Sequence, residues 1–297
     1  MTTPPGARGS GHGGVQGQFS PLTYPWHRTT MPPMSNPASR RTWDDASNRT
    51  WDGAVNLHDL GGLPLDDGET TAPGRIWRSG APEPITPTGW AEAIEAGLTT
   101  VLDLRNAAEI AQAHDHLPDA VRPGTIVTHR TPTEDPGDPH FLEACGPWLD
   151  HPRSYAPNTA MYPHLFGAVF RALADAPGAV LVNCSAGRDR TGMITAMLLS
   201  LTGVEHRAIA DDYEQAFRGT THRGGIAYDV EQGAWVQHPG ETWTARQMDE
   251  RVRERRAALL GWLADLDAVA YLRYSGVDEG RIRSLRGRLR GRAAPGS

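Results

Sequence analysis

The stretch NCSAGRDRTG, residues 183–192, decides how the rest of the chain is interpreted. It joins a short apolar run, GAVLVNC (178–184), to a second apolar run, RTGMITAMLLSLTG (190–203). The first run is short and rich in β-branched residues, which favours a strand. The second is apolar nearly all round, which favours a helix buried in the centre of a domain. The sequence therefore predicts a strand, a tight loop and a buried helix, with Cys184 at the start of the loop.

Three other segments have the same strand character. They are short, contain β-branched residues and are bounded by Gly, Pro or Asp: GRIWRS (74–79), TTVLDLR (99–105) and GTIVTHR (124–130). Helical patterns occupy residues 86–97, 107–118, 158–178, 190–203, 205–219, 242–276 and 278–291. Pro163 is expected in the first turn of the main helix of its segment. Strands that alternate with helices predict an α/β fold, with a mostly parallel central sheet flanked by helices.

Two parts of the chain lack such patterns. Residues 1–50 are rich in Pro, Gly, Ser and Thr and have few periodic apolar positions, so we expect a disordered tail. One domain is expected over residues 51–291. Within it, residues 219–242 fit neither a helical nor a strand period and predict a long excursion, and such excursions are usually functional or mobile.

Composition limits the classes of partner. The chain has 29 basic and 35 acidic residues, a formal net charge of -6, so we expect no nucleic acid and no anionic membrane as a partner. Neither a signal peptide nor a transmembrane run of 18 apolar residues is found, which predicts a cytoplasmic protein. Two cysteines, Cys145 and Cys184, cannot build a disulfide framework. A protective disulfide between these two is the less favoured alternative.

The loop after Cys184 favours phosphate chemistry. A thiolate at the N-terminus of a helix faces the positive end of the helix dipole. Gly187 permits a tight backbone whose N–H groups can surround a tetrahedral oxyanion, and Arg190 can hold two phosphate oxygens with its planar fork. Thr191 can donate its hydroxyl to the sulfur when the sulfur becomes a leaving group. The candidate phosphate-binding residues are Ser185, Ala186, Gly187, Arg188, Asp189, Arg190 and Thr191. Such chemistry needs no metal and no other cofactor.

The segment CSAGRDRTG resembles the Cys-x5-Arg-Thr signature of the protein tyrosine phosphatase superfamily, in the form found in its bacterial tyrosine and lipid phosphatase branch. Four other segments are similar to blocks of that branch: NLHDLGGLPLDDG (56–68), GRIWRSGAP (74–82), VLDLRNAAEI (101–110) and AYLRYSGVDEGRIRSLRGRL (270–289). The resemblance covers about residues 51–291 and implies a dual-specificity-phosphatase-like fold. It also implies hydrolysis of phosphate monoesters through a phosphocysteine intermediate. The implied substrates are proteins with phosphotyrosine, phosphoserine or phosphothreonine, or phosphoinositides.

The chain departs from that branch at three positions. Asn183 stands where histidine usually precedes the nucleophile, Arg188 where lysine is usual, and His58 where the opening block usually has arginine. For the general acid, the resemblance points to Asp189 of the loop. Asp103, at the end of a neighbouring strand, is the second choice, and it could equally be a structural carboxylate that binds Arg190 or backbone amides.

Two other functions stay open at the level of sequence. One is a binding module of the same fold, in which Asn183 marks a weakened catalyst that retains the phosphate site. The other is a sulfurtransferase, which also uses a cysteine in a phosphate-like loop. The Arg-Thr-Gly sequence after the loop and the flanking blocks argue against the sulfurtransferase.

Overall fold

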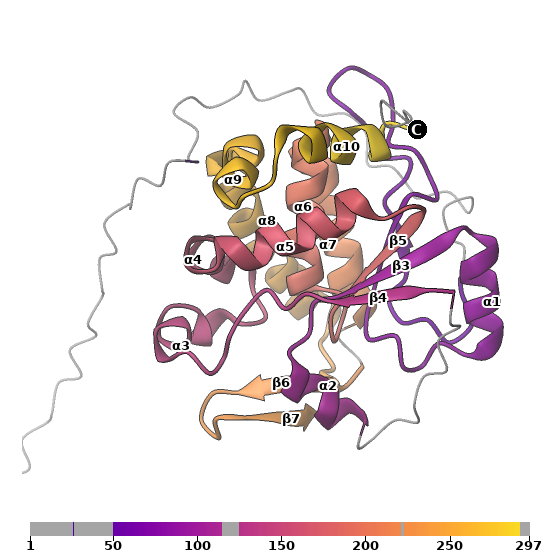
Figure 1. The fold of residues 1–297 in the computed structure, drawn as a ribbon. Helices are drawn as coiled ribbons and strands as arrows, with labels where there is room; N and C mark the ends of the chain where they lie inside the picture. Colours follow the sequence, from indigo (N-terminus) through magenta and orange to yellow (C-terminus); the bar gives the residue numbers. More distant parts are fainter. Residues whose placement is uncertain (1–25, 27–49, 115–124, 221–222, 292–297) are drawn as a thin grey trace, which may run out of the picture.

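A five-stranded sheet lies at the centre of the computed structural model, which describes residues 26, 50–114, 125–220 and 223–291 (Figure 1). Its strands are β1 (His58–Asp59), β2 (Ile76–Ser79), β3 (Leu98–Asp103), β4 (Val127–Arg130) and β5 (Ala179–Asn183). Their order is β1-β2-β5-β3-β4. Only the pairing of β1 with β2 is antiparallel within this sheet. The predicted α/β class with a mostly parallel sheet is confirmed.

Most of the described residues outside this sheet are helical. They are α1 (Pro87–Glu95), α2 (Ala107–His114), α3 (Pro139–Cys145), α4 (Tyr155–Met161), α5 (Pro163–Asp175), α6 (Asp189–Thr202), α7 (His206–Thr220), α8 (Ala245–Asp265), α9 (Ala268–Tyr274) and α10 (Glu279–Leu289). Two short 3-10 helices, η2 (Gly146–Trp148) and η3 (Pro152–Ser154), follow α3. Of the predicted helix over 107–118, α2 covers residues 107–114, and residues 115–118 lie outside the described part of the chain.

The segment predicted as one helix over 158–178 contains two. Helix α4 begins earlier than predicted, at Tyr155, and α5 begins at Pro163. Tyr162 between them leaves the helical conformation because the proline ring disfavours that conformation in the preceding residue. Pro163 is in the first turn of α5, as predicted. Helix α3 was not predicted, although Asp138 caps it and Pro139 is in its first turn.

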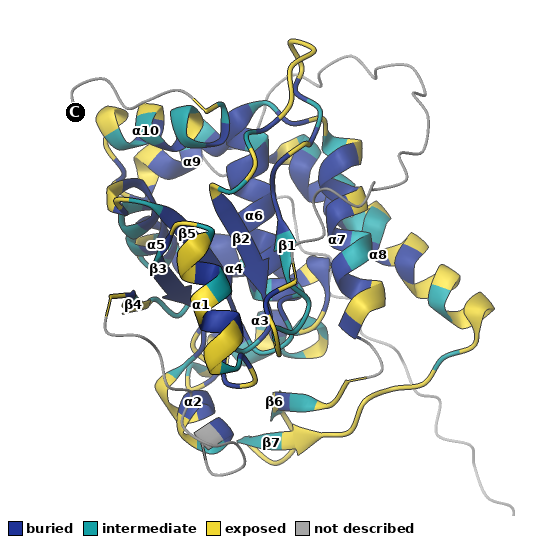
Figure 2. Cartoon of the chain, turned by 90° about the vertical axis from the view of Figure 1, so that its right-hand side faces the viewer, coloured by how far each residue is buried: buried dark blue, intermediate teal, exposed yellow. Residues whose placement is uncertain are grey.

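Side chains of the buried strands alternate between two hydrophobic clusters. In β5, Val180 and Val182 face the larger cluster, which α5 and α6 help to build. Leu181 faces the smaller cluster together with Trp77 and with Trp90 of α1. The sheet is therefore covered on both faces, which is why its central strands are buried throughout (Figure 2). Helix α6 is buried along nearly its whole length, as predicted.

The described part of residues 219–242 forms more regular structure than the sequence predicted. They contain a two-stranded antiparallel hairpin, β6 (Gly225–Asp229) and β7 (Ala234–His238), which contacts α2 (Figure 1). Asp229 accepts hydrogen bonds from the backbone N–H groups of Glu231 and Gln232 and thereby closes the turn. These strands are short and only partly buried, so they carry a weak periodic signal.

The expected tail over residues 1–50 lies outside the described residues, apart from Trp26 and Thr50. Trp26 is buried, and its carbonyl accepts a hydrogen bond of 2.9 Å from the N–H of Asp267. Its ring packs edge-on against Tyr271 of α9, with 5.3 Å between the ring centroids. One residue of the expected tail therefore packs against the domain. None of the described helices has the length and apolar character needed to cross a membrane.

The close approach of α5 to the turn after α9 predicts a stability effect. A Cβ added at Gly167 would overlap the backbone carbonyl of Ser275, whereas a Cβ at the exposed Gly261 of α8 would meet nothing within 4 Å. We expect Gly167→Ala to lower the free energy of unfolding by about 1–3 kcal/mol, because the two segments must separate. The matched control Gly261→Ala should raise it by about 0.5–1 kcal/mol through helix propensity. Urea denaturation measures both changes, and a more stable Gly167→Ala protein would contradict the packing.

Candidate active site

Four parallel strands end at one edge of the sheet. Ser79 of β2 and Asp103 of β3 are both in register with Asn183, the last residue of β5. Asp103 is also in register with Arg130, which ends β4. Ligands of open α/β sheets bind outside the carboxyl ends of the strands. Cys184 directly follows β5 and therefore lies at the edge where a ligand is expected.

The loop from Cys184 to α6 has the tight backbone predicted for it. Gly187 has a φ of 69°, a conformation that favours glycine, and a Cβ at this position would overlap the backbone of Ser79. Within the described part of the chain, no group accepts a hydrogen bond from the backbone N–H groups of residues 185–188. With the N-terminus of α6 beside them, these groups are suited to bind an anion.

Donors behind the loop hold its carbonyl groups. The fully buried Arg78 donates to the carbonyls of Gly187 (2.8 Å) and Arg188 (3.2 Å) and forms an ion pair with Asp212 of α7. The amide of Asn56 donates to the carbonyl of Ala186 at 3.0 Å. In a trans peptide the N–H group points away from the carbonyl. The donors behind the loop therefore leave its N–H groups on the opposite side.

His58 supports Asn56 in turn. Its Nε2 lies 2.9 Å from Oδ1 of Asn56, and because that oxygen is an acceptor, Nε2 carries the proton. Burial is the main reason why the pKa of His58 falls to about 4, while Asp212 raises it and Arg78 lowers it further. The neutral imidazole is thus the form that holds Asn56 against the loop.

Arg190, in the first turn of α6, is held by a bidentate ion pair. Its two terminal nitrogens lie 2.5 and 2.7 Å from the carboxylate oxygens of Glu109 on α2. Its Nε lies 3.4 Å from a carboxylate oxygen of Glu134. Although burial opposes the charge, the carboxylate of Glu109 raises the pKa of Arg190 well above its usual value. Arg190 therefore brings a permanent positive charge to the loop.

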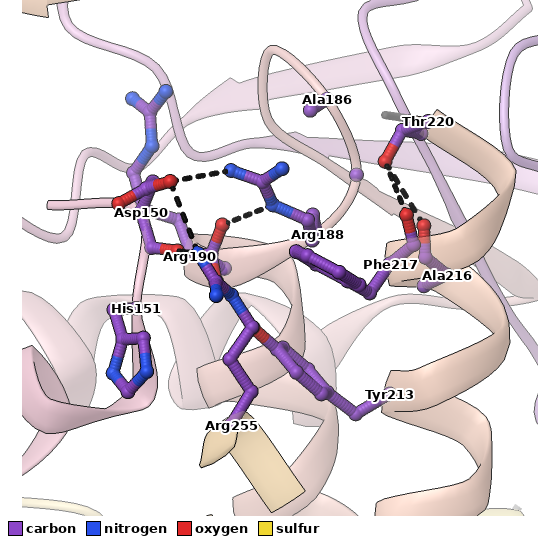
Figure 3. Close-up of polar contacts among 12 residues, drawn as sticks. Asp150, His151, Ala186, Arg188, Arg190, Tyr213, Ala216, Phe217, Thr220 and Arg255 are labelled. Atoms are coloured by element: carbon purple, nitrogen blue, oxygen red, sulfur yellow. Dashed lines mark hydrogen bonds and ion pairs between the residues drawn. The ribbon is translucent and has the colours of Figure 1, made fainter. Parts of the chain in front are cut away.

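Arg188 and Asp189 form a second group of contacts, shown in part in Figure 3. Nε of Arg188 donates to Asp189 at 2.6 Å, and its NH2 group lies 3.4 Å from Asp150. The hydroxyl of Tyr213 donates to the other carboxylate oxygen of Asp189 at 2.7 Å. Burial raises the pKa of Tyr213 well above its usual value, so this hydroxyl keeps its proton. Both oxygens of Asp189 therefore receive a donor.

Asp103 lies in a buried ionic network below the loop. It accepts hydrogen bonds from Nε (2.9 Å) and NH2 (2.8 Å) of Arg105 and from the side-chain amide of Asn183 (3.2 Å). Arg105 also pairs with Glu83 at 2.6 Å. Of the two structural partners expected for Asp103, the structure shows the backbone amide: Asp103 accepts a hydrogen bond of 3.2 Å from the N–H of Arg105, and Arg190 is paired with Glu109.

A cavity of about 400 Å³ opens over the loop. The loop and α6 contribute Cys184, Ser185, Ala186, Arg188, Asp189 and Arg190 to its walls, and Glu134 follows β4. The β6–β7 hairpin and the segment after it contribute Tyr228, Trp235 and Trp243. The hydroxyl of Ser185 donates to the carbonyl of Ile226 at 2.8 Å and fixes the hairpin to the loop. Asp103 is absent from the cavity walls.

The two cysteines have different surroundings. Both thiols are free in the structure. Cys145 packs with Phe141 and Tyr162 in a small separate cluster, and burial raises its pKa to about 12. The less favoured disulfide is not formed. Thr191 is fully buried, and its hydroxyl has no hydrogen-bond partner among the described residues.

Six of the residues singled out from the sequence, from Cys184 to Arg190 without Gly187, line the cavity, but sequence reasoning missed the groups that hold the loop. Arg78, Glu109 and Asn56 all lie in segments that resemble the phosphatase branch, so their positions were visible, but their contacts with the loop were not. Glu134 had a weaker signal, as an acidic residue shortly after a strand of the sheet.

The burial of His58 predicts a dependence of stability on pH. Unfolded His58 takes up a proton near pH 6.5 and folded His58 only near pH 4, so folding loses stability as pH falls through this interval. His58→Gln keeps an N–H donor for Asn56 and removes the titration. Between pH 6.5 and 4, the wild type should lose up to about 3 kcal/mol more than the variant in free energy of unfolding. Urea denaturation across this pH range measures both, and parallel curves would show that His58 is not buried as described.

Comparison with known proteins identifies the family. Residues 49–291 match the tyrosine phosphatase family. A tyrosine-protein phosphatase from Nostoc commune is 32% identical over 212 residues, which are 65% of this chain and 66% of that protein. The triple specificity protein phosphatase PtpB from Mycobacterium tuberculosis is 26% identical over 262 residues, 76% of this chain and 94% of that protein. The crystal structure of P. aeruginosa TpbA aligns at 13% identity with a TM-score of 0.37, covering 80% of this chain and all of that one. Because the family match covers most of its length, the chain belongs to the tyrosine phosphatase family, whose members are phosphoric monoester hydrolases.

Proposed function

We propose that this chain hydrolyses phosphate monoesters with Cys184 as nucleophile, through a phosphocysteine intermediate. The observation that carries the proposal is that Cys184 and Arg190 line one cavity with Ser185, Ala186 and Arg188, and that no described group accepts from the backbone N–H groups of residues 185–188. The N–H groups and the guanidinium neutralise the charge that repels a nucleophile from a phosphate dianion. The thiolate can then attack phosphorus.

Each part of the loop has a place in this reaction. Glu109 fixes the plane of the Arg190 guanidinium, so the donors that the phosphate meets are oriented before it binds. The positive end of the helix dipole of α6 favours the bound anion. The unpartnered hydroxyl of Thr191 is available to stabilise the sulfur when it leaves phosphorus in the second step.

The walls of the cavity favour phosphotyrosine as the substrate. Tyr228, Trp235 and Trp243 supply aromatic surface above the loop. A phosphorylated phenol ring can pack against such surface, which a serine phosphate is too short to use. Arg188 and Arg223 also line the cavity and add positive charge, so phosphoinositides and phosphoserine or phosphothreonine are the next substrates to assay. The names of the two sequence relatives agree with a phosphatase of this type.

A binding module without turnover is the alternative function. It rests on Asn183, which replaces the usual histidine before the nucleophile. The amide of Asn183 is fully buried and donates to Asp103, so it supports the strand end below the loop and leaves the loop residues in place. Turnover of a small aryl phosphate favours the enzyme, and tight phosphate binding without turnover favours the module.

The two free cysteines supply a matched pair of variants. Cys184→Ser should lower kcat by at least about 10³-fold, because a neutral alcohol replaces the anionic nucleophile. Cys145→Ser removes a thiol that lies outside the cavity, so it should keep the wild-type rate. Steady-state hydrolysis of para-nitrophenyl phosphate gives both values. Equal activity of the two variants would remove Cys184 from the mechanism.

Arg190→Lys tests the geometry of the phosphate site. Lysine keeps the charge but cannot form the bidentate pair with Glu109 or offer two parallel donors to phosphate. We expect kcat/KM to fall by the equivalent of about 2–4 kcal/mol. The same exchange at Arg218, which pairs with Asp249 away from the cavity, should leave kcat/KM unchanged. A wild-type rate for Arg190→Lys would assign the phosphate to another ligand.

A further inference from the structure

One carboxyl group of the cavity differs from the others in its partners. Asp189 receives hydrogen bonds from Arg188 and Tyr213, and Asp150 is exposed and lies beside Arg188 and Arg255 (Figure 3). Glu134 has an ion-pair contact of 3.4 Å with Nε of Arg190, and no described residue donates a hydrogen bond to it. Its carboxyl group therefore lacks the hydrogen-bond donors that contact Asp189 and Asp150.

Glu134 is held close to the loop by a short segment after β4. The N–H of Thr131 donates to the carbonyl of Asp103 at 2.8 Å, which continues the sheet register one residue past β4. Thr133 is fully buried, and Glu134 itself is 7% exposed. At the other end, Asp138 caps α3. The segment is thus anchored on both sides, with Glu134 in the wall of the same cavity as Cys184.

The surroundings of Glu134 favour its protonated form. Burial is the main reason why its pKa rises to about 7. Arg190 lowers the pKa, while Glu109 and Asp189 raise it. The nearby thiol of Cys145 is uncharged at neutral pH, because its own pKa is about 12. A phosphate dianion in the loop would add a further negative charge and strengthen the hold on the proton.

We propose that Glu134 is the catalytic residue that gives a proton to the leaving-group oxygen, in place of either aspartate predicted from the sequence. The assignment rests on the proposed phosphatase function. Three features carry it: Glu134 lines the cavity of Cys184, it is almost fully buried, and no described donor competes for its oxygens.

The two steps balance with Glu134 as the only proton carrier. In the first, the thiolate of Cys184 forms a bond to phosphorus, the bond from phosphorus to the ester oxygen breaks, and that oxygen takes the proton of Glu134. The alcohol or phenol departs and leaves a carboxylate beside Arg190. In the second, this carboxylate takes a proton from water while the water oxygen attacks phosphorus. The sulfur–phosphorus bond breaks, inorganic phosphate departs, and both the thiolate and the protonated Glu134 are restored.

Asp189 and Asp103 are less suited to this task. Arg188 donates to one carboxylate oxygen of Asp189 and Tyr213 donates to the other, so both oxygens are engaged within the protein. Asp103 is bound by Arg105 and lies outside the cavity walls. Asp189 then acts as a positioning residue that fixes Arg188 and Tyr213 around the start of α6.

The test compares leaving groups in the isosteric variant Glu134→Gln. Phenyl phosphate and O-phosphoserine need a proton on the departing oxygen, and para-nitrophenyl phosphate needs it much less. We expect kcat/KM to fall by about 10²–10⁴-fold for the first two and only a few-fold for the third. In the wild type, kcat/KM for phenyl phosphate should fall above a pKa of about 7, and this basic limb should disappear in Glu134→Gln.

Three further variants separate an acid from a residue that only positions Arg190. Glu109→Gln disturbs Arg190 without removing the acid, so it should slow all three substrates by the same factor and keep the basic limb. Asp189→Asn should also slow all substrates equally. Asp135→Asn changes an exposed acid next to Glu134 and should retain wild-type rates. A uniform loss or no loss in Glu134→Gln would overturn the proposal, as would a leaving-group effect confined to Asp189→Asn or Asp135→Asn.

A spectroscopic measurement keeps the proposal testable apart from turnover. The infrared difference between wild type and Glu134→Gln should contain the carbonyl band of a protonated carboxyl group at pH 6, and the band should vanish by pH 9. Absence of this band at pH 6 would overturn the proposal even if Glu134→Gln is slow. A wild type that shows the band but hydrolyses none of the three phosphates would instead refute the proposed phosphatase function and, with it, any acid role.

Discussion

Hydrogen bonds from Arg78 and Asn56 to the carbonyl groups of the loop are the interactions on which the site depends. Each peptide group in residues 185–188 could direct its N–H group to either side of the loop. The side chains of Asn56 and Arg78 determine this direction, because they donate hydrogen bonds to the carbonyl groups of Ala186, Gly187 and Arg188. The N–H groups are left toward the cavity. Buried polar contacts therefore prepare the proposed phosphate site before any substrate arrives.

The buried carboxyl groups around the loop differ in the hydrogen-bond donors that contact them. Glu109 and Asp103 each receive two hydrogen bonds from one guanidinium, and Asp189 receives one from Arg188 and one from Tyr213. These hydrogen bonds hold the arginines in place. Glu134 lacks them and is surrounded by other carboxylates, so burial favours its neutral form. The same side-chain chemistry thus gives three carboxyl groups that are held by donors and, at Glu134, the proposed proton carrier.

Much of the fold could be predicted from the sequence, because strands and helices carry local periodic signals. Short apolar runs, bounded by Gly, Pro or Asp, predict strands β2, β3, β4 and β5. The same kind of signal predicts the buried helix α6 and the turn that leads into it. The β6–β7 hairpin could not be predicted, since its partly buried strands have weak alternation and depend on contacts with α2 and Ser185. The ion pair of Arg190 with Glu109 joins residues 81 positions apart, and no local pattern encodes it. Burial of Glu134 likewise arises only when the elements pack together.

The central claim is that phosphate passes through a covalent bond to the sulfur of Cys184. It is tested most directly by mixing the full-length protein with a phosphotyrosine peptide, quenching in acid within the first turnover and locating the phosphate by mass spectrometry of the digested chain. The account predicts one added phosphate on the peptide that carries Cys184, formed before inorganic phosphate appears and absent in Cys184→Ser. Release of inorganic phosphate with no phosphate ever bound to Cys184, or with phosphate bound to another residue, would contradict it.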